Sequence, residues 1–118
     1  MRMWMLNPAL LCRRHLLGEH GELHKFIPCW RKRQGIANRI AGNAIEPGSY
    51  LARHDVLAAE MLRRGYRHES PGEQPDFSYL SIQEQKAVVD VQVSLAELVN
   101  RCPECRKRVI LQGYNFLH

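Results

Sequence analysis

The stretch that decides the fold lies close to the start of the chain, at residues 13–26, and reads RRHLLGEHGELHKF. At 3.6 residues per helical turn, His15, Glu19 and Glu22 fall at i, i+4 and i+7 and therefore line one stripe of a helix. The neighbouring stripe is apolar and holds Leu16, Leu23 and Ile27. The stretch predicts a helix that presents two carboxylates and an imidazole beside a face that packs into a core.

Helical periodicity elsewhere predicts an all-α fold, a single compact domain of about three main helices with the N-terminal segment packed against them. The first helix is expected from Pro8 to Ile27, stopped near Pro28. The second is expected to begin after an N-cap at Ser49 and to end at residues 63–65. The third is expected to open at the Ser94-x-x-Glu97 sequence and to end at Pro103.

The segments between these helices carry weaker patterns. Residues 29–41 fit a short or irregular helix, and residues 66–79 read as a surface loop because they hold prolines, a glycine and polar residues. Ser81-x-x-Glu84 has capping-box spacing and predicts a short helix through Ala87. Residues 88–93 alternate imperfectly and could form a strand, but no second strand is available to pair with it.

Length and composition limit the possible protein classes. The chain has 118 residues, of which 45% are hydrophobic, enough for one core spanning residues 1–118 and too few for two ordinary domains. No stretch approaches the roughly 18 uninterrupted apolar residues of a membrane span, and the first residues lack the features of a signal peptide. We therefore expect a cytoplasmic, monomeric protein with no membrane partner.

The charge favours a polyanionic partner. The formal net charge is +5, and the basic residues are grouped. Nucleic acid is the commonest polyanion that such groups bind, whereas the alternative is a set of solvated helix ends where cations are favoured. The basic groups comprise Arg13 and Arg14; Arg31, Lys32 and Arg33; Arg63, Arg64 and Arg67; and Arg101, Arg106, Lys107 and Arg108.

Cysteines and histidines leave a metal-binding alternative open. Cys102-Pro-Glu-Cys105 could be half of a zinc site, a redox pair or two unrelated thiols, and no second CxxC or CxxH follows it. His20 and His24 are four residues apart, as in two-histidine helical zinc sites, although the HExxH order is absent. One rival hypothesis is therefore a zinc-dependent hydrolase or a zinc-stabilised domain built from these four residues.

The order of several motifs resembles a known family. The line His15-Leu16-x-x-Glu19-x-x-Glu22-Leu23, preceded by Met1-Arg2, is similar to the N-terminus of the pyrimidine-dimer DNA glycosylases, the phage endonuclease V type of ultraviolet-repair enzyme. The similarity continues in the second predicted helix and is faint near the third. The positions that carry it there are Arg53, Leu57, Ala59, Glu60, Leu62, Arg63, Arg64, Gly65, Tyr66, Leu95, Glu97 and Pro103.

The resemblance implies an all-helical domain that excises a damaged base and then cleaves the strand at the resulting abasic site. Its nucleophile is the N-terminal α-amine, which falls on Met1 here because bulky Arg2 should prevent removal of the methionine. An α-amine has a pKa of about 7.7–8.0, so an appreciable fraction is uncharged near pH 7. Glu22 takes the position of the catalytic carboxylate, and no metal or organic cofactor is implied.

The resemblance also implies a double-stranded damaged DNA partner. Arg2 matches a phosphate or sugar contact, and His15 and Lys25 match positions near the lesion-bearing strand. Charge alone makes Arg13, Arg14, Arg31, Lys32 and Arg33 candidate phosphate contacts. The other rival hypothesis is a non-catalytic nucleic-acid-binding module that keeps the same fold and charge.

Overall fold

The computed structural model describes residues 2–113, and within that range the chain is helical with no strand. The prediction of an all-α fold is confirmed. The α-helices are α1 (Arg13–Lys25), α2 (Ile27–Lys32), α3 (Ile36–Ala41), α4 (Tyr50–Arg63), α5 (Ile82–Gln85), α6 (Val91–Arg101) and α7 (Pro103–Leu111), with short 3-10 helices η1 (Pro8–Leu10) and η2 (Pro47–Ser49).

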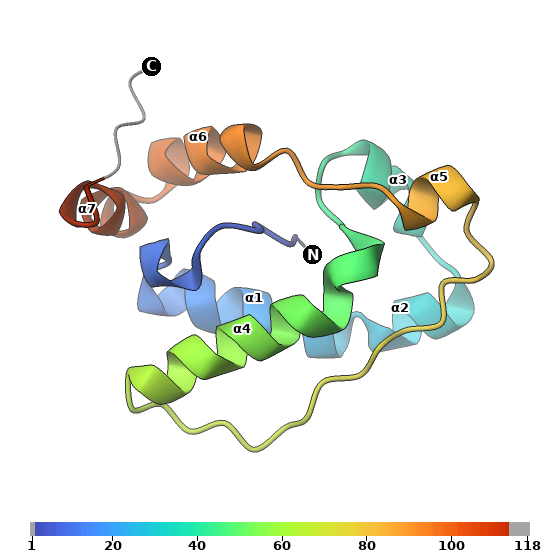
Figure 1. Ribbon diagram of the computed structural model, residues 1–118, viewed down its shortest axis with the longest axis horizontal. Coiled ribbons are helices and arrows are strands. Elements are labelled where there is room, and N and C mark those ends of the chain that lie inside the picture. Colours follow the sequence, from blue (N-terminus) through green and yellow to red (C-terminus); the bar gives the residue numbers. More distant parts are fainter. Residues whose placement is uncertain (1, 114–118) are drawn as a thin grey trace.

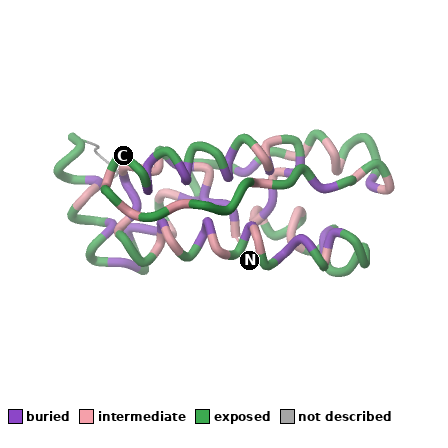
Figure 2. Tube along the Cα trace, turned by 90° about the horizontal axis from the view of Figure 1, so that it is seen from below, coloured by how far each residue is buried: buried purple, intermediate pink, exposed green. Residues whose placement is uncertain are grey.

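The helices form a flattened body whose Cα extents are 41 × 36 × 18 Å. Helices α1 and α4 lie side by side and run in opposite directions, and the N-terminal segment passes between α1 and α6 (Figure 1). Seen from its edge, the body has buried positions along its whole length, so the core is not confined to one end (Figure 2).

The N-terminal segment contributes to this core, as predicted. Met3, Trp4 and Leu6 are all buried, and the Met3 backbone N–H donates a hydrogen bond of 2.7 Å to the carbonyl of Ala44. Burying three large side chains outweighs the tendency of a chain end to fray. The residues that lead into α1 are therefore held in place against the helices.

The predicted single helix over residues 8–27 is wrong, because the chain breaks it twice. Asn7 caps the 3-10 helix η1, and extended backbone at Cys12 (ψ 168°) separates η1 from α1. Pro28 does not stop a helix; it lies in the first turn of α2, where its missing N–H leaves no hydrogen bond unmade. Proline is thus the start of a new helix here rather than the end of the old one.

The same correction applies at the C-terminal side. Helix α6 begins at Val91, because the Asp90 carboxylate accepts the backbone N–H groups of Gln92 and Val93, and Ser94 lies buried inside the helix. The helix ends at Arg101, just before Pro103, as predicted, but Pro103 also opens a further helix, α7, which the sequence did not predict. The strand considered for residues 88–93 is absent.

Other local predictions are confirmed. Ser81 and Glu84 form the expected capping box. Helix α4 begins directly after Ser49, but the Ser49 hydroxyl donates to Glu46 and does not cap the helix. Residues 66–79 contain no helix or strand, and this loop is pinned at Glu73, whose carboxylate accepts a 2.8 Å hydrogen bond from Arg31. The Gln74 side chain accepts the backbone N–H of Leu51, so the loop lies against the start of α4.

Candidate active site at the start of the chain

A pocket of about 370 Å³ opens where the N-terminal segment, α1 and the end of α6 meet. Its walls combine three guanidinium groups, one exposed carboxylate and one indole. The lining residues are Arg2, Trp4, Arg14, His15, Gly18, Glu19, Glu22 and Arg101. A cavity with this lining attracts an anion and places it beside a carboxylate.

The carboxylate of Glu22 lies next to the beginning of the chain. The backbone N–H of Arg2 donates a hydrogen bond of 3.1 Å to Glu22 Oε2, and Glu22 is exposed on the side of α1 that borders the pocket. Met1 lies outside the described residues. The peptide nitrogen that joins it to Arg2 is the atom in contact with Glu22.

The Arg2 side chain forms part of the pocket wall. Its guanidinium forms an ion pair with Glu97 of α6 and stacks 4.2 Å from the centre of the Trp4 ring. Arg101 lies 5.8 Å from the same ring and 3.8 Å from Glu97. Two further donor nitrogens of Arg2, Nε and Nη2, are buried and have no hydrogen-bond acceptor within residues 2–113. Buried donors are ordinarily satisfied by another protein group or by an ordered water molecule.

His15 is half-buried on the same wall, with its ring edge-on to Trp4 at 5.9 Å. Burial, together with the charges of Arg14 and Arg101, lowers the pKa of His15 below its ordinary value. The ring is therefore neutral at pH 7 and does not contribute a positive charge to the pocket. Its Nδ1 atom lies 3.3 Å from the sulfur of Cys12.

Glu19 has a different environment, although it lies on the same helix stripe. Its carboxylate accepts two hydrogen bonds from Arg53 of α4, of 2.6 and 2.9 Å, and both side chains are almost completely buried. Arg53 also donates a hydrogen bond of 2.6 Å to the carbonyl of Leu6. Burial raises the pKa of the Glu19 carboxyl, while Arg53 acts in the opposite direction. This pair joins α1, α4 and the N-terminal segment.

The remaining predicted DNA contacts do not line the pocket. Arg13 stacks on Tyr66 at 5.4 Å, and Lys25 is exposed at the end of α1. Arg31, Lys32 and Arg33 are exposed at the end of α2, where Arg31 pairs with Glu73 and Arg33 stacks on Tyr79 at 4.9 Å. The pocket thus gathers Arg2, Arg14, His15 and Glu22 from the predicted set. It adds Arg101, predicted only as a member of a basic group, and Trp4, which was not predicted to belong to a site.

The metal-binding candidates fall into two groups that differ from the predicted combination. Cys102 and Cys105 gather with Cys12 and His15, whereas His20 and His24 gather with His54 and His68. The predicted site that combined His20 and His24 with the CxxC pair is therefore wrong. His20 faces His54 of α4, whereas Cys102 lies at the α6–α7 junction and contacts Cys12 at the start of α1.

Within the second group, burial and the neighbouring imidazoles lower the pKa of His20 to about 4, and the same causes lower the pKa of His24. Both rings are therefore neutral at pH 7.

The fold and the pocket define a class: a small all-helical protein in which an acidic side chain and a cationic pocket surround the start of the chain. The family model for pyrimidine dimer DNA glycosylases matches residues 1–74, which run from the N-terminal segment through α4. The chain belongs to the pyrimidine dimer DNA glycosylase family, as the sequence resemblance predicted. Helices α5, α6 and α7 lie beyond the matched region.

Neither the curated proteins nor the solved structures gave a significant match. None of the helices within residues 2–113 combines the length and apolar character that crossing a membrane requires.

Proposed function

We propose that this protein excises damaged bases from double-stranded DNA and cleaves the resulting abasic site, with the Met1 α-amine as nucleophile and Glu22 as the catalytic carboxylate. Family membership supports a DNA glycosylase, and the 3.1 Å hydrogen bond from the Arg2 backbone N–H to Glu22 supports the choice of nucleophile. That bond carries the proposal, since it puts the carboxylate next to the first peptide bond of the chain.

In the proposed reaction the uncharged amine attacks C1′ of the damaged nucleotide's deoxyribose, and the bond from C1′ to the base breaks. The base leaves with the bonding electrons and takes a proton, and opening of the sugar ring gives an iminium ion on the amine. Removal of a C2′ proton then expels the 3′ phosphate by β-elimination. Glu22 stabilises the positive charge that develops on the sugar and moves protons in these steps. Water releases the amine at the end.

The pocket cations would hold the strand during this reaction. Arg2 has two buried donors without an acceptor within the described residues, and Arg14 and Arg101 add positive charge to the same pocket. Guanidinium groups bind phosphate oxygens through charge-assisted hydrogen bonds. We assign these three arginines to the phosphates that flank the damaged nucleotide. That nucleotide would be displaced from the base stack, which would expose its sugar.

Borohydride reduction of the iminium ion provides the direct test. Wild-type protein incubated with abasic-site duplex and borohydride should give a covalent protein–DNA product, with the DNA on the N-terminal peptide by mass spectrometry. Glu22→Gln should lower the rate of product formation by about 10²-fold or more, the range of positioned acid–base groups. The matched control is Glu69→Gln, because Glu69 lies on the exposed loop after α4 and its side chain is 77% exposed.

A second variant separates this proposal from its rivals. A short extension before Met1 removes the free amine at that position and should abolish trapping, while the same extension after His118 should not. Trapping that survives the N-terminal extension, or DNA attached to an internal lysine peptide, would overturn the choice of nucleophile. Tight duplex binding without any trapping or strand cleavage would instead favour the non-catalytic binding module.

A further inference from the structure

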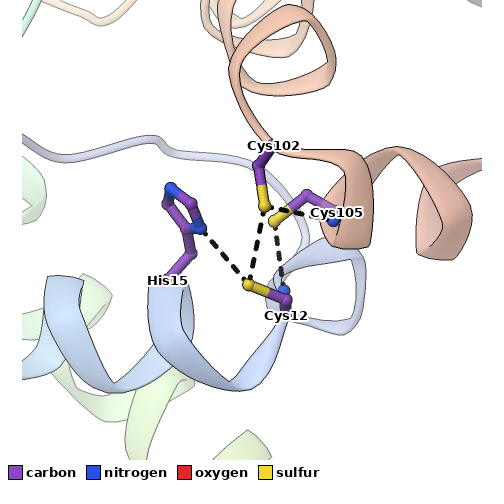
Figure 3. Close-up of side chains that lie close together, drawn as sticks. All are labelled: Cys12, His15, Cys102 and Cys105. Carbon is purple, nitrogen blue, oxygen red and sulfur yellow. Dashed lines mark hydrogen bonds between the residues drawn. The ribbon is translucent and has the colours of Figure 1, made fainter.

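A cluster of three thiols and one imidazole lies at the junction of α1, α6 and α7. Cys12 and His15 come from the start of α1, and Cys102 and Cys105 come from the start of α7 (Figure 3). The potential ligand atoms of all four side chains lie within 4.8 Å of one another. None of the four thiols of the chain is in a disulfide. Residues more than eighty positions apart in the sequence thus converge on one point.

We propose that Cys12, His15, Cys102 and Cys105 bind one zinc ion as a structural Cys₃His site. A tetrahedral zinc ion with Zn–S bonds of about 2.3 Å and Zn–N bonds of about 2.0–2.1 Å places two sulfurs roughly 3.8 Å apart and a sulfur and nitrogen roughly 3.6 Å apart. The sulfurs of Cys12 and Cys102 are 3.8 Å apart, and the Cys12 sulfur is 3.3 Å from His15 Nδ1. These separations already approximate the edges of the coordination tetrahedron.

Backbone N–H groups are directed at two of the three sulfur atoms in the cluster. The backbone N–H of Cys12 points at the Cys105 sulfur at 3.2 Å, and the backbone N–H of Cys105 points at the Cys102 sulfur at 3.4 Å. Cys12 and Cys102 are also the N-cap residues of α1 and α7, where the helix dipole stabilises negative charge. The adjoining pocket carries four cations and one carboxylate: Arg13, Arg14, Lys107, Arg108 and Glu104.

Spacing supports the same conclusion. Cys12-x-x-His15 and Cys102-x-x-Cys105 are two pairs with the two-residue separation that structural zinc sites use. Each pair lies at the start of a helix, and the zinc ion would join those helix ends. His15 and Arg101 both line the pocket that holds Glu22, and Arg101 precedes the first ligand of the second pair. The zinc ion would therefore fix one wall of that pocket without taking part in its chemistry.

The four histidines form a second candidate metal site, which is supported by observations independent of those at the Cys₃His site. His54 Nε2 lies 3.2 Å from His20 Nε2 and 3.1 Å from His24 Nε2, close to the roughly 3.3 Å between two nitrogens of a tetrahedral zinc site. One imidazole nitrogen offers either a lone pair or a proton, so it cannot serve two neighbouring rings equally well. His68 Nε2 is buried without a hydrogen-bond partner in residues 2–113.

The histidine cluster also has the outer partner that metal-bound imidazoles use. His54 Nδ1 lies 2.9 Å from the carboxylate of Asp55, and a carboxylate at that nitrogen fixes the tautomer that leaves Nε2 available to a metal. We infer that His20, His24, His54 and His68 bind a second divalent transition-metal ion, with zinc as the probe. This ion would join α1 to α4 and to the loop that follows α4.

Metal analysis tests both sites without reference to activity. Full-length, untagged protein purified with a thiol reductant should contain two equivalents of zinc per chain, or take up two on reconstitution with zinc alone. Cys102→Ser and His54→Gln should each remove one equivalent, whereas Cys29→Ser should remove none, since Cys29 belongs to neither group. Uptake below a tenth of an equivalent would overturn both assignments, and one equivalent would overturn whichever site retains no metal.

Two measurements on the unmodified protein test the Cys₃His site even if the substituted proteins fail to fold. A mercurial reagent that blocks thiols should release one equivalent of zinc to a chromogenic chelator and leave the other bound. Cobalt substitution should give thiolate-to-cobalt charge-transfer absorption from one equivalent only. Absence of that absorption, or a native disulfide between Cys12 and Cys102 found by alkylation and mass spectrometry, would overturn the Cys₃His site.

Discussion

The two carboxylates of α1 show how differently two neighbouring positions on one helix are used. Glu19 is buried against α4 in a two-hydrogen-bond pair with Arg53, whereas Glu22, three residues later, is exposed at the pocket and accepts the Arg2 backbone N–H. From the sequence they are equivalent members of one polar stripe. The difference shows that the helix period places side chains on a face, but the neighbouring element decides whether a carboxylate is buried in an ion pair or exposed at a pocket.

Removing the partner of the buried carboxylate should have the largest effect on stability. Arg53→Leu leaves the Glu19 charge buried and unpaired and should lower the free energy of unfolding by about 3–5 kcal/mol, measured by urea denaturation. Glu22→Gln should change it by less than about 0.5 kcal/mol. Replacing both members, as Glu19→Met with Arg53→Leu, should recover part of the loss. Similar costs for Arg53→Leu and Glu22→Gln would abolish the distinction between the two sides.

The loop after α4 offers a second way to disturb the α4 side alone. A Cβ atom on Gly72 would approach His54 Nδ1 to 2.6 Å and Leu51 Cδ1 to 2.7 Å, so Gly72→Ala must shift packed atoms. The expected cost is about 1–3 kcal/mol in urea denaturation. Gly48→Ala is the matched control, because its nearest contact would be an ordinary 3.6 Å. An unchanged midpoint for Gly72→Ala would show that the loop is not closely packed there.

The pocket side should respond through DNA binding and not through stability. Arg14→Gln removes one exposed pocket cation and should reduce the slope of log affinity against log salt by about 0.9, the value for one lost phosphate contact. Fluorescence anisotropy on duplex DNA at several salt concentrations measures this slope. Lys86→Gln removes the same charge from the exposed end of α5 and should leave the slope unchanged. Equal changes in both variants would indicate binding without a defined pocket.

The smallest expected effect is a gain in stability within α1 itself. Gly21 lies inside the helix, and a Cβ atom there would meet no atom within 4 Å. Gly21→Ala should therefore stabilise the protein by about 0.5–1 kcal/mol, since alanine loses less conformational freedom on forming a helix. Borohydride trapping should be unaffected, because Gly21 does not line the pocket. If Gly21→Ala were instead destabilised, another group of the protein would have to lie close to this position.

The sequence predicted helices well where a long apolar stripe carries the signal, as in α1 and α4. It failed at Pro28 and Pro103, because each could be read as a stop or as a first-turn residue. Whether a proline ends one helix or begins the next depends on whether the residues after it can pack against the core as a helix. Periodicity alone does not contain that information.

For the site, Glu22 and Arg2 were chosen by resemblance to a family, and the structure brings them into contact. Trp4 was missed, and Arg101 was recognised only as part of a basic group, because their place in the pocket depends on tertiary packing. The Cys₃His cluster did have a sequence signal: Cys12-x-x-His15 repeats the spacing of the CxxC pair. It was overlooked because it precedes that pair by ninety residues rather than following it.

The family match ends at residue 74, yet the pocket does not. Glu97 pairs with Arg2, Arg101 lines the cavity, and Arg108 donates a hydrogen bond of 2.9 Å to the carbonyl of Ala9. Helices α6 and α7, which lie beyond the matched region, therefore complete the wall of a pocket that the matched region begins. A chain cut after residue 74 would therefore lose both the Glu97 partner of Arg2 and the Arg101 side of the pocket.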